Sequence, residues 1–184
     1  MHFYQYQNPP LAYSHFKDLA KERQAKFIAG LSKNKQTLVD VICFCLMPNH
    51  FHLILKQNQD KGISDFLGNI QNSYAKYFNL KRKRTGSLFQ SGFKAVLIED
   101  DDQLKHVSRY IHLNPYTSML ISKPENLNQY LWSSFSQYTG IKNGFCQCGI
   151  ILDQFKSRAE YKSYVLNMAD YQKKLGEIKH LIKE

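Results

Sequence analysis

The sequence lacks the features that mark membrane, secreted and disulfide-rich proteins. No apolar run approaches the roughly 20 residues of a transmembrane helix, and the N-terminal stretch MHFYQYQNPP has no basic-then-apolar secretion signal. Cysteine is scarce, with 4 in 184 residues, which fits the reducing cytosol. These absences predict a protein that stays in the cytoplasm.

The few cysteines are also spaced wrongly for the commonest zinc sites. Cys43 and Cys45 lie in the apolar run VICFCL, and Cys146 and Cys148 lie in FCQCG. Both pairs have the spacing C-x-C, whereas most zinc knuckles use C-x-x-C. A structural zinc site remains the alternative to four free thiols, and the spacing does not favour it.

Positive charge and aromatic rings are what the chain has in excess. It contains 25 Lys and Arg against 15 Asp and Glu, a net charge of +10, together with 12 Tyr and 12 Phe. Cations neutralise phosphates and aromatic faces stack on unpaired bases. The combination therefore favours a nucleic-acid partner, although composition alone leaves open a basic protein without one.

The hydrophobic pattern predicts one domain of the α+β class. Apolar residues recur on one side over residues 11–32, which predicts a helix. The runs TLVDVICFCLM and HFHLILK are β-branched and apolar, and the turn signal Pro48-Asn49 separates them. This arrangement predicts an antiparallel hairpin with His50 and His52 on its second strand.

The rest of the chain predicts further helices and one more strand. The acids that begin at Asp100 suit a helix N-terminus, where they meet free amides and the positive dipole end. Asn114-Pro115 should stop that helix, because proline disfavours helical geometry in the residue before it. The other expected elements are a helix over 62–83, a third strand at 93–99, and helices over 153–168 and from 169 onward.

The stretch MPNHFHLILKQ raises the question of a metal site. Side chains at i and i+2 of a strand point the same way, about 7 Å apart at the α-carbons. His50 and His52 can therefore converge on one ion. Because the chain has 7 His, such a pair also arises by chance, and core packing is the better explanation of the pair by itself.

The helix that ends near Asn114 offers groups that such a site would need. Its apolar face should pack on the sheet, and a polar stripe beside it includes His106, Tyr110 and Asn114. An amide oxygen at the negative end of a helix suits a hard cation, with Tyr110 one turn earlier. The alternative is that Tyr110 is a packing residue and Asn114 a helix stop. His106 is a proton acceptor or, as we expect, idle, and His112 should face elsewhere.

Four segments in this order resemble the REP-associated tyrosine transposases, a branch of the single-tyrosine HUH, IS200-like transposases. The segments are CLMPNHFHLIL, YAKYFNLKRKRTGSLFQSGFK, LIEDDDQLKHVSRYIHLNPY and LWSSFSQY. The resemblance implies a ferredoxin-like antiparallel sheet with helices packed on one face. It also implies a catalytic domain over 1–140, a C-terminal helical extension of the same unit over 141–184, and a nucleoid-associated protein of bacteria. Such proteins usually begin with a strand, which only MHFYQYQ can supply here.

The resemblance further implies a site and a reaction. His50 and His52 match two metal ligands, Asn114 matches the third, and Tyr110 matches the nucleophile. In such enzymes Mg²⁺ or Mn²⁺ polarises a phosphate of single-stranded DNA at or near a hairpin, and the tyrosine forms a 5′-phosphotyrosine. A nearby cation would help here, because a phenol with a pKa near 10 is a poor nucleophile at neutral pH. The enzyme would act as a monomer or a homodimer.

Candidate DNA contacts and two other functions complete the expectations. A run of cations ends the predicted helix over 62–83. These cations are either a solvated helix end or contacts to backbone phosphates. The candidate contacts are Lys81, Arg82, Lys83, Arg84, Lys105 and Arg109, of which Arg109 can also point away. The main alternative function is a catalytically inactive or domesticated nucleic-acid-binding protein. A metallonuclease that uses water is the third hypothesis.

Overall fold

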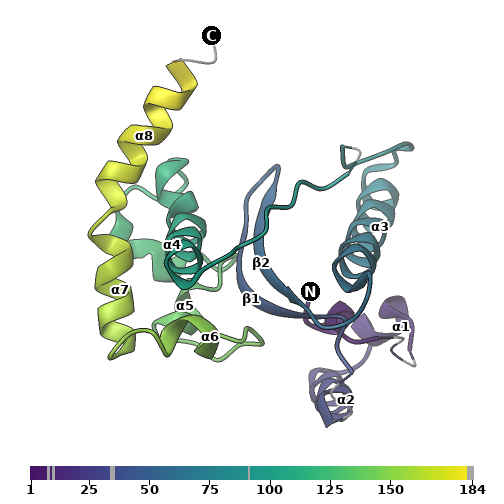
Figure 1. Cartoon of the computed structure of the whole chain (residues 1–184). Helices are drawn as coiled ribbons and strands as arrows, with labels where there is room; N and C mark the ends of the chain where they lie inside the picture. Colours follow the sequence, from purple (N-terminus) through teal and green to yellow (C-terminus); the bar gives the residue numbers. More distant parts are fainter. Residues whose placement is uncertain (8, 10, 34–35, 91, 182–184) are drawn as a thin grey trace. The chain divides into compact units, whose positions relative to one another are not determined.

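The computed structural model divides the chain into two compact units that alternate along the sequence (Figure 1). Unit 1 comprises residues 1–40 and 55–96, and unit 2 comprises residues 41–54 and 97–184. Among the described residues no helix has the length and apolar composition needed to cross a bilayer. The structure describes the whole chain except residues 8, 10, 34–35, 91 and 182–184.

A hairpin of β1 (Val39–Leu46) and β2 (Phe51–Gln57) confirms the predicted strand pair. The backbone amide of Met47 donates to the carbonyl of His50 at 2.8 Å and closes the turn. Nearly all of β1 is buried, as its apolar, β-branched sequence requires. Because β2 begins at Phe51, only His52 lies on the strand, and the expectation that His50 does so too is wrong by one residue.

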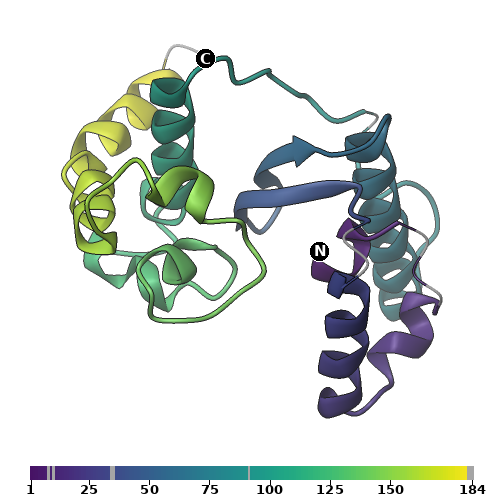
Figure 2. The same cartoon turned by 60° about the horizontal axis from the view of Figure 1, so that its bottom comes forward.

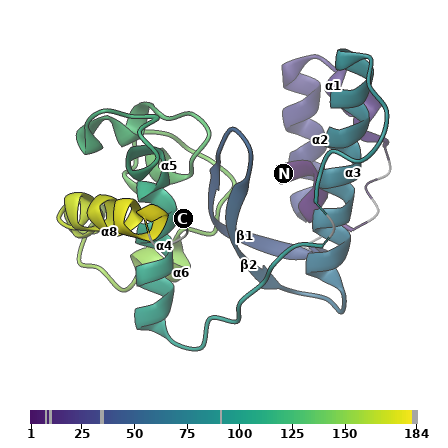
Figure 3. The same ribbon diagram turned by 90° about the horizontal axis from the view of Figure 1, so that it is seen from above.

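Unit 1 contains two helices where one was expected over residues 11–32. These are α1 (Tyr13–Lys17) and α2 (Lys21–Lys33), seen beside α3 (Gly62–Arg82) in Figure 3. The break lets Phe16 of α1 and Phe27 of α2 both pack on Phe3, with ring centroids 4.8 and 6.2 Å from it. Aromatic packing across the break thus replaces a continuous helix.

The segment MHFYQYQ, the one candidate for a first strand, pairs like a strand at a single residue. Residues His2–Gln5 form the 3₁₀ helix η1, which directs Phe3 into the aromatic cluster. Only Tyr6 pairs in a strand-like way, through an antiparallel bridge with Thr37. The start of the chain therefore adds a single bridge beside β1.

Helix α3 agrees with the expectation for residues 62–83, and both of its ends have a local cause. It starts at Gly62, where a Cβ atom would clash with the carbonyl oxygen of Leu38. It ends at Lys83, which has the left-handed φ of 50°, and the amide of Arg84 then donates to the carbonyl of Asn79 at 3.0 Å. This is the hydrogen-bond pattern of a helix that stops at a left-handed residue.

The third strand expected at residues 93–99 is wrong. The segment is irregular, with Val96 84% and Leu97 78% exposed. A high β-propensity reflects packing against neighbouring strands, and in the part of the chain that the structure describes the sheet has two strands only. The α+β class is confirmed, and the larger ferredoxin-like sheet stays a prediction.

Unit 2 is built around α4 (Asp101–Thr117), against which α7 (Arg158–Leu166) and α8 (Ala169–Leu181) pack (Figures 1 and 2). The carboxylate of Asp100 accepts from the amide of Gln103 at 2.7 Å, which confirms the predicted helix start. The shorter elements of this unit are η2 (Pro124–Gln129), α5 (Phe135–Tyr138) and α6 (Gly149–Leu152). Helix α7 begins later than residue 153 because Ser157 caps it.

The predicted stop at Asn114-Pro115 is wrong, since α4 continues to Thr117. Asn114, Pro115 and Tyr116 are all buried in unit 2. Proline disfavours helical geometry in the preceding residue without forbidding it, and the burial of these side chains outweighs that preference. The result is that Asn114 lies within the last turns of a helix and not after its end.

His112 faces the core of unit 2, away from solvent, as expected. It is completely buried, with Nδ1 2.7 Å from the hydroxyl oxygen of Tyr161 and Nε2 2.8 Å from Oγ of Ser134. Burial lowers its pKa from 6.5 to about 3, so the imidazole is neutral. The ring is therefore a hydrogen-bonded core residue.

Candidate active site

Two imidazole rings meet where the hairpin turn leads into β2. The ring centroids of His50 and His52 are 4.9 Å apart, and the rings are nearly perpendicular, at 86°. Strand-like alternation accounts for this, because residues i and i+2 share one side of the backbone. Nδ1 of His50 lies 2.6 Å from the side-chain oxygen of Asn49. Since that oxygen can only accept, Nδ1 of His50 donates the hydrogen bond and Nε2 points elsewhere as the other ring nitrogen.

Tyr110 on α4 lies beside this pair of histidines. Its ring centroid is 5.6 Å from that of His52, at an interplanar angle of 81°. The side chain is 46% exposed, so solvent and a ligand can reach it. The interpretation of Tyr110 as a half-buried packing residue does not explain why its ring borders that of His52, which itself meets His50.

Asn114 lies one turn further along α4 and is mostly buried. Its side-chain nitrogen donates to the carbonyl of Tyr110 at 2.9 Å, and 5% of the residue is exposed. This bond fixes the amide against the helix and leaves its oxygen as the atom for any ligand role. The assignment of Asn114 as a metal ligand stays a prediction.

The charge state of His52 suits a ligand role. Burial, and secondly the positive charge of His50, lower the pKa of His52 from its ordinary value of 6.5. A neutral imidazole is the form that binds a metal. Among the described residues no three or more His, Cys, Asp and Glu are grouped to hold an ion. A metal at this place would thus rest on two imidazoles and the amide oxygen of Asn114, a donor set with open positions.

Two contacts at this site were not predicted. One is the Asn49 side chain on His50, for which an adjacent polar residue was the only signal. The other comes from α8, where the side-chain nitrogen of Gln172 donates to the carbonyl of Tyr110 at 3.2 Å. Nothing in the sequence indicated it, because 62 residues separate the two.

The two candidate DNA contacts on α4 already have partners. Lys105 forms an ion pair with Asp102 at 2.7 Å. The guanidinium of Arg109 lies 4.4 Å from the ring centroid of Tyr164, and it donates to Nδ1 of His106 at 2.6 Å. That bond occupies one nitrogen of His106, in keeping with the expectation that His106 is idle.

The cation run Lys81–Arg84 belongs to unit 1, at the end of α3. Nζ of Lys81 donates to the hydroxyl of Tyr77 at 3.1 Å, and Arg84 donates to the carbonyl of Ser87 at 3.1 Å. All four side chains are exposed. The run is therefore a charged surface with its charges open to solvent.

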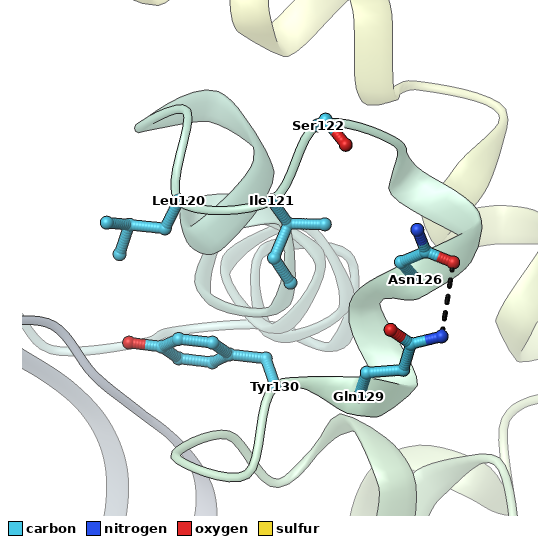
Figure 4. A pocket seen from close by; sticks show the side chains of 6 residues that line it. All are labelled: Leu120, Ile121, Ser122, Asn126, Gln129 and Tyr130. Atoms are coloured by element: carbon cyan, nitrogen blue, oxygen red, sulfur yellow. Dashed lines mark hydrogen bonds between the residues drawn. The ribbon is translucent and has the colours of Figure 1, made fainter.

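A hollow in unit 2, of about 350 Å³, is lined by none of the candidate site residues or candidate DNA contacts (Figure 4). Asn126 and Gln129 bond to each other across it at 3.4 Å. The hydroxyl of Tyr130, also in its lining, donates to the carbonyl of Leu46 at 2.7 Å and fixes the end of β1. Asn126, Gln129 and Tyr130 are thus engaged within the protein.

The four cysteines are free thiols, with Cys43 and Cys45 buried. Burial raises the pKa of Cys45 to about 12 and that of Cys148 to about 11. Protonated thiols are poor metal ligands and poor nucleophiles. They do not compete with the phenol of Tyr110 for a chemical role.

The fold and this site define a basic α+β protein in which a half-exposed tyrosine borders His52, whose ring in turn meets that of His50. The family described as transposase IS200-like matches residues 12–114, more than half of the chain. The chain therefore belongs to the IS200-like transposases, which confirms the resemblance and makes DNA its partner. The match includes both histidines, Tyr110 and Asn114. No curated protein and no solved structure matches the chain.

Proposed function

We propose that the chain cleaves and rejoins single-stranded DNA through Tyr110, with a divalent metal held by His50, His52 and Asn114. The observation that carries the proposal is the ring contact between Tyr110 and His52, whose ring also meets that of His50. A solvent-accessible phenol beside two metal-binding imidazoles combines a nucleophile with the means to activate a phosphate.

The residues present fit a divalent metal in their chemistry. Bound at this place, Mg²⁺ or Mn²⁺ would polarise the scissile phosphate and offset the charge that builds on its oxygens. Imidazole nitrogen is a softer donor than carboxylate or water, and the affinity of Mg²⁺ for it is low. Of these two ions, Mn²⁺ is therefore the one that two histidines and one amide favour.

In the proposed reaction the hydroxyl oxygen of Tyr110 attacks the phosphorus of the scissile phosphate. The bond from phosphorus to the 3′ oxygen breaks, that oxygen takes a proton, and the phenol proton passes to solvent. A 5′-phosphotyrosine and a free 3′-hydroxyl result. Rejoining reverses the step, since the attack of a 3′-hydroxyl releases the phenol without any external energy source.

Neighbouring residues of unit 2 would hold the nucleophile in position. Asn114 and Gln172 both donate to the carbonyl of Tyr110, which fixes the backbone that carries the phenol. The ring of His52 limits the orientations of the phenol on one side. Such positioning matters because the attacking oxygen must lie in line with the leaving oxygen.

The proposed substrate is a single strand at or beside a DNA hairpin. The exposed run Lys81–Arg84 would contact backbone phosphates. Lys105 and Arg109 would contribute less, because Asp102 and Tyr164 already engage them. The ferredoxin-like architecture, the catalytic domain over 1–140, the extension over 141–184 and the action as monomer or homodimer belong to the same proposal.

The test is the formation of a covalent protein–DNA adduct. The protein is incubated with Mn²⁺ and 3′-labelled single strands that flank a hairpin, and labelled protein is measured on a denaturing gel. We expect an adduct with the wild type and none with Tyr110→Phe, because the ring remains while the nucleophile is lost. Tyr171→Phe changes a tyrosine on α8 that is more exposed than Tyr110, at 58% against 46%; it serves as the matched control and should react normally.

Two outcomes would contradict the proposal. If the wild type binds these strands but forms no adduct across a broad set of sequences, the chain is a nucleic-acid-binding protein without catalysis. If Tyr110→Phe cleaves DNA at the wild-type rate, water is the nucleophile and the chain is a hydrolytic nuclease.

The metal ligands give a separate prediction. His50→Ala should reduce adduct formation on the order of tenfold or more at limiting Mn²⁺, as loss of a ligand requires.

A further inference from the structure

One face near the C-terminal end of α3 combines exposed aromatic rings with cations. Tyr74, Tyr77, Phe78 and Lys81 follow the spacing i, i+3, i+4 and i+7, which places them on one side of the helix. Tyr74 is 49% and Tyr77 is 50% exposed. We refer to these four residues as the aromatic face of α3, which lies within unit 1 (Figure 3).

The rings of this face are contiguous. The ring centroid of Tyr74 lies 6.5 Å from that of Tyr77 and 6.1 Å from that of Phe78. Phe89, in the segment after the helix, lies 6.1 Å from Tyr74 on the same cluster. The rings support one another in a fixed arrangement, and half of each tyrosine remains open to solvent.

Cations surround the rings. Nζ of Lys81 lies 5.5 Å from the ring centroid of Tyr77. The guanidinium groups of Arg82 and Arg84 lie 6.0 and 5.9 Å from that of Phe78. The hydrogen bond and charge of Lys81, with the charges of Lys17 and Arg82, also lower the pKa of the Tyr77 hydroxyl. The local field is therefore positive.

Exposed rings among cations fit a polyanion that presents flat apolar faces. Single-stranded nucleic acid does so, because its bases are free to stack on tyrosine while its phosphates meet lysine and arginine. A duplex hides its base faces. The separation of 6.5 Å between Tyr74 and Tyr77 is also about twice the roughly 3.4 Å rise of a duplex strand, so two bases on these rings must be unstacked from each other.

We propose that the aromatic face of α3 is a base-stacking platform for single-stranded DNA. Bases stack on Tyr74 and Tyr77, and the neighbouring phosphates contact Lys81 and Arg82. The choice of DNA over other single strands rests on the proposed function. The platform itself does not depend on Tyr110 or on a metal.

The test compares a normal strand with one that has no bases. Binding of a labelled oligo(dT) and of an abasic oligonucleotide of equal length is measured by fluorescence anisotropy in EDTA. We expect Tyr74→Ala/Tyr77→Ala to weaken oligo(dT) binding about tenfold or more and abasic binding less than about twofold, since stacking needs a base. Equal losses on both strands, or no loss on either, would overturn the proposal.

Matched variants separate stacking from folding. Tyr74→Phe/Tyr77→Phe keeps both rings and should bind oligo(dT) within about twofold of the wild type. Tyr171→Ala removes a tyrosine of α8 that is 58% exposed and should leave binding unchanged. Thermal unfolding checks each variant, and the single changes Tyr74→Ser and Tyr77→Ser decide the matter if the double alanine variant unfolds.

The experiment also separates this proposal from the proposed function. If the double alanine variant loses affinity for oligo(dT) but not for the abasic strand, and the wild type forms no covalent adduct, the platform is supported and the catalysis is rejected. Adduct formation with equal losses on normal and abasic strands would reject the platform alone. Binding of oligo(rU) about tenfold tighter than oligo(dT) would overturn the assignment to DNA.

Discussion

Histidines in this chain occupy two contrasting environments. His112 is completely enclosed and bonds to Tyr161 and Ser134, whereas His52 is partly buried and borders the exposed ring of Tyr110. Burial lowers the pKa of both. The same physical effect thus favours the neutral form of both rings.

The enclosed histidine makes stability depend on pH. Because its pKa falls from 6.5 to about 3 on folding, the unfolded chain binds a proton more readily. The contribution of the buried neutral His112 to the free energy of unfolding is complete above the pKa of the unfolded chain. It is lost as the pH falls, by up to about 1.4 kcal/mol per pH unit. Urea unfolding at several pH values should show a flatter dependence between pH 6.5 and 5 for His112→Gln than for the wild type.

The exposed His106 supplies the control for that measurement. His106→Gln makes the same substitution at an exposed imidazole and is measured alongside. His112→Gln should also be less stable at pH 7, since glutamine cannot reproduce both bonds of the imidazole. Identical slopes for His112→Gln and the wild type would contradict the role given to the buried ring.

At the level of single residues the sequence predicted the site in part. Alternation along a strand was enough to expect His50 and His52 on one side, and helical spacing was enough to relate Tyr110 to Asn114. That Tyr110 borders His52 depends on how α4 packs in unit 2, which no local pattern contains. The contact of Gln172 with the carbonyl of Tyr110 had no signal in the sequence, because it joins two helices that are far apart along the chain.

Among the elements, those with strong periodicity were predicted and those decided by tertiary packing were not. The hairpin, α3 and the start of α4 follow from alternation, helical spacing and a capping aspartate. The split between α1 and α2 follows from rings that gather on Phe3. Residues 93–99 have strand-like composition, but in the described part of the chain no strand pairs with them. Helix α4 passes through Pro115 because the surroundings of Pro115 bury it.

Helix α8 provides a prediction about catalysis at this scale. Gln172→Ala removes one of the two side-chain bonds to the carbonyl of Tyr110. A neutral hydrogen bond contributes about 1 kcal/mol, so adduct formation should slow about fivefold while DNA affinity stays constant. Quench-flow measurement of the adduct at saturating DNA tests this.

A neighbour on the same helix gives the comparison for Gln172. Tyr171→Ala changes an exposed side chain of α8 without touching α4, and it should leave the rate unchanged. Restoring an amide as Gln172→Asn should recover little, because the shorter side chain does not reach. A wild-type rate in Gln172→Ala would mean that Asn114 alone positions the backbone of Tyr110.

For the whole molecule, the net charge is +10, and exposed cations should contribute more to DNA binding than cations that already have partners. Each phosphate contact to a single strand changes the slope of log K against log salt by about 0.7. Replacing the run Lys81–Arg84 by glutamines should therefore reduce that slope by about 3. Anisotropy titrations from low to moderate salt measure it.

The paired cations of α4 are the internal reference for that slope. Lys105→Gln/Arg109→Gln should change it by less than about 1, because these side chains have partners in the protein. An unchanged slope in the variant of the cation run would show that its charges do not contact DNA.

The division of the chain into two units had no signal in the sequence, because no change of composition marks where the hairpin passes from one to the other.

The left-handed conformation of Lys83 has a consequence for how this surface evolves. A lysine with φ of 50° is less favourable than glycine there by roughly 1 kcal/mol. Selection for folding alone would replace it with glycine and end α3 more firmly. Under the proposed function, Lys83→Gly would therefore exchange a positive charge for a more stable helix end and weaken DNA binding.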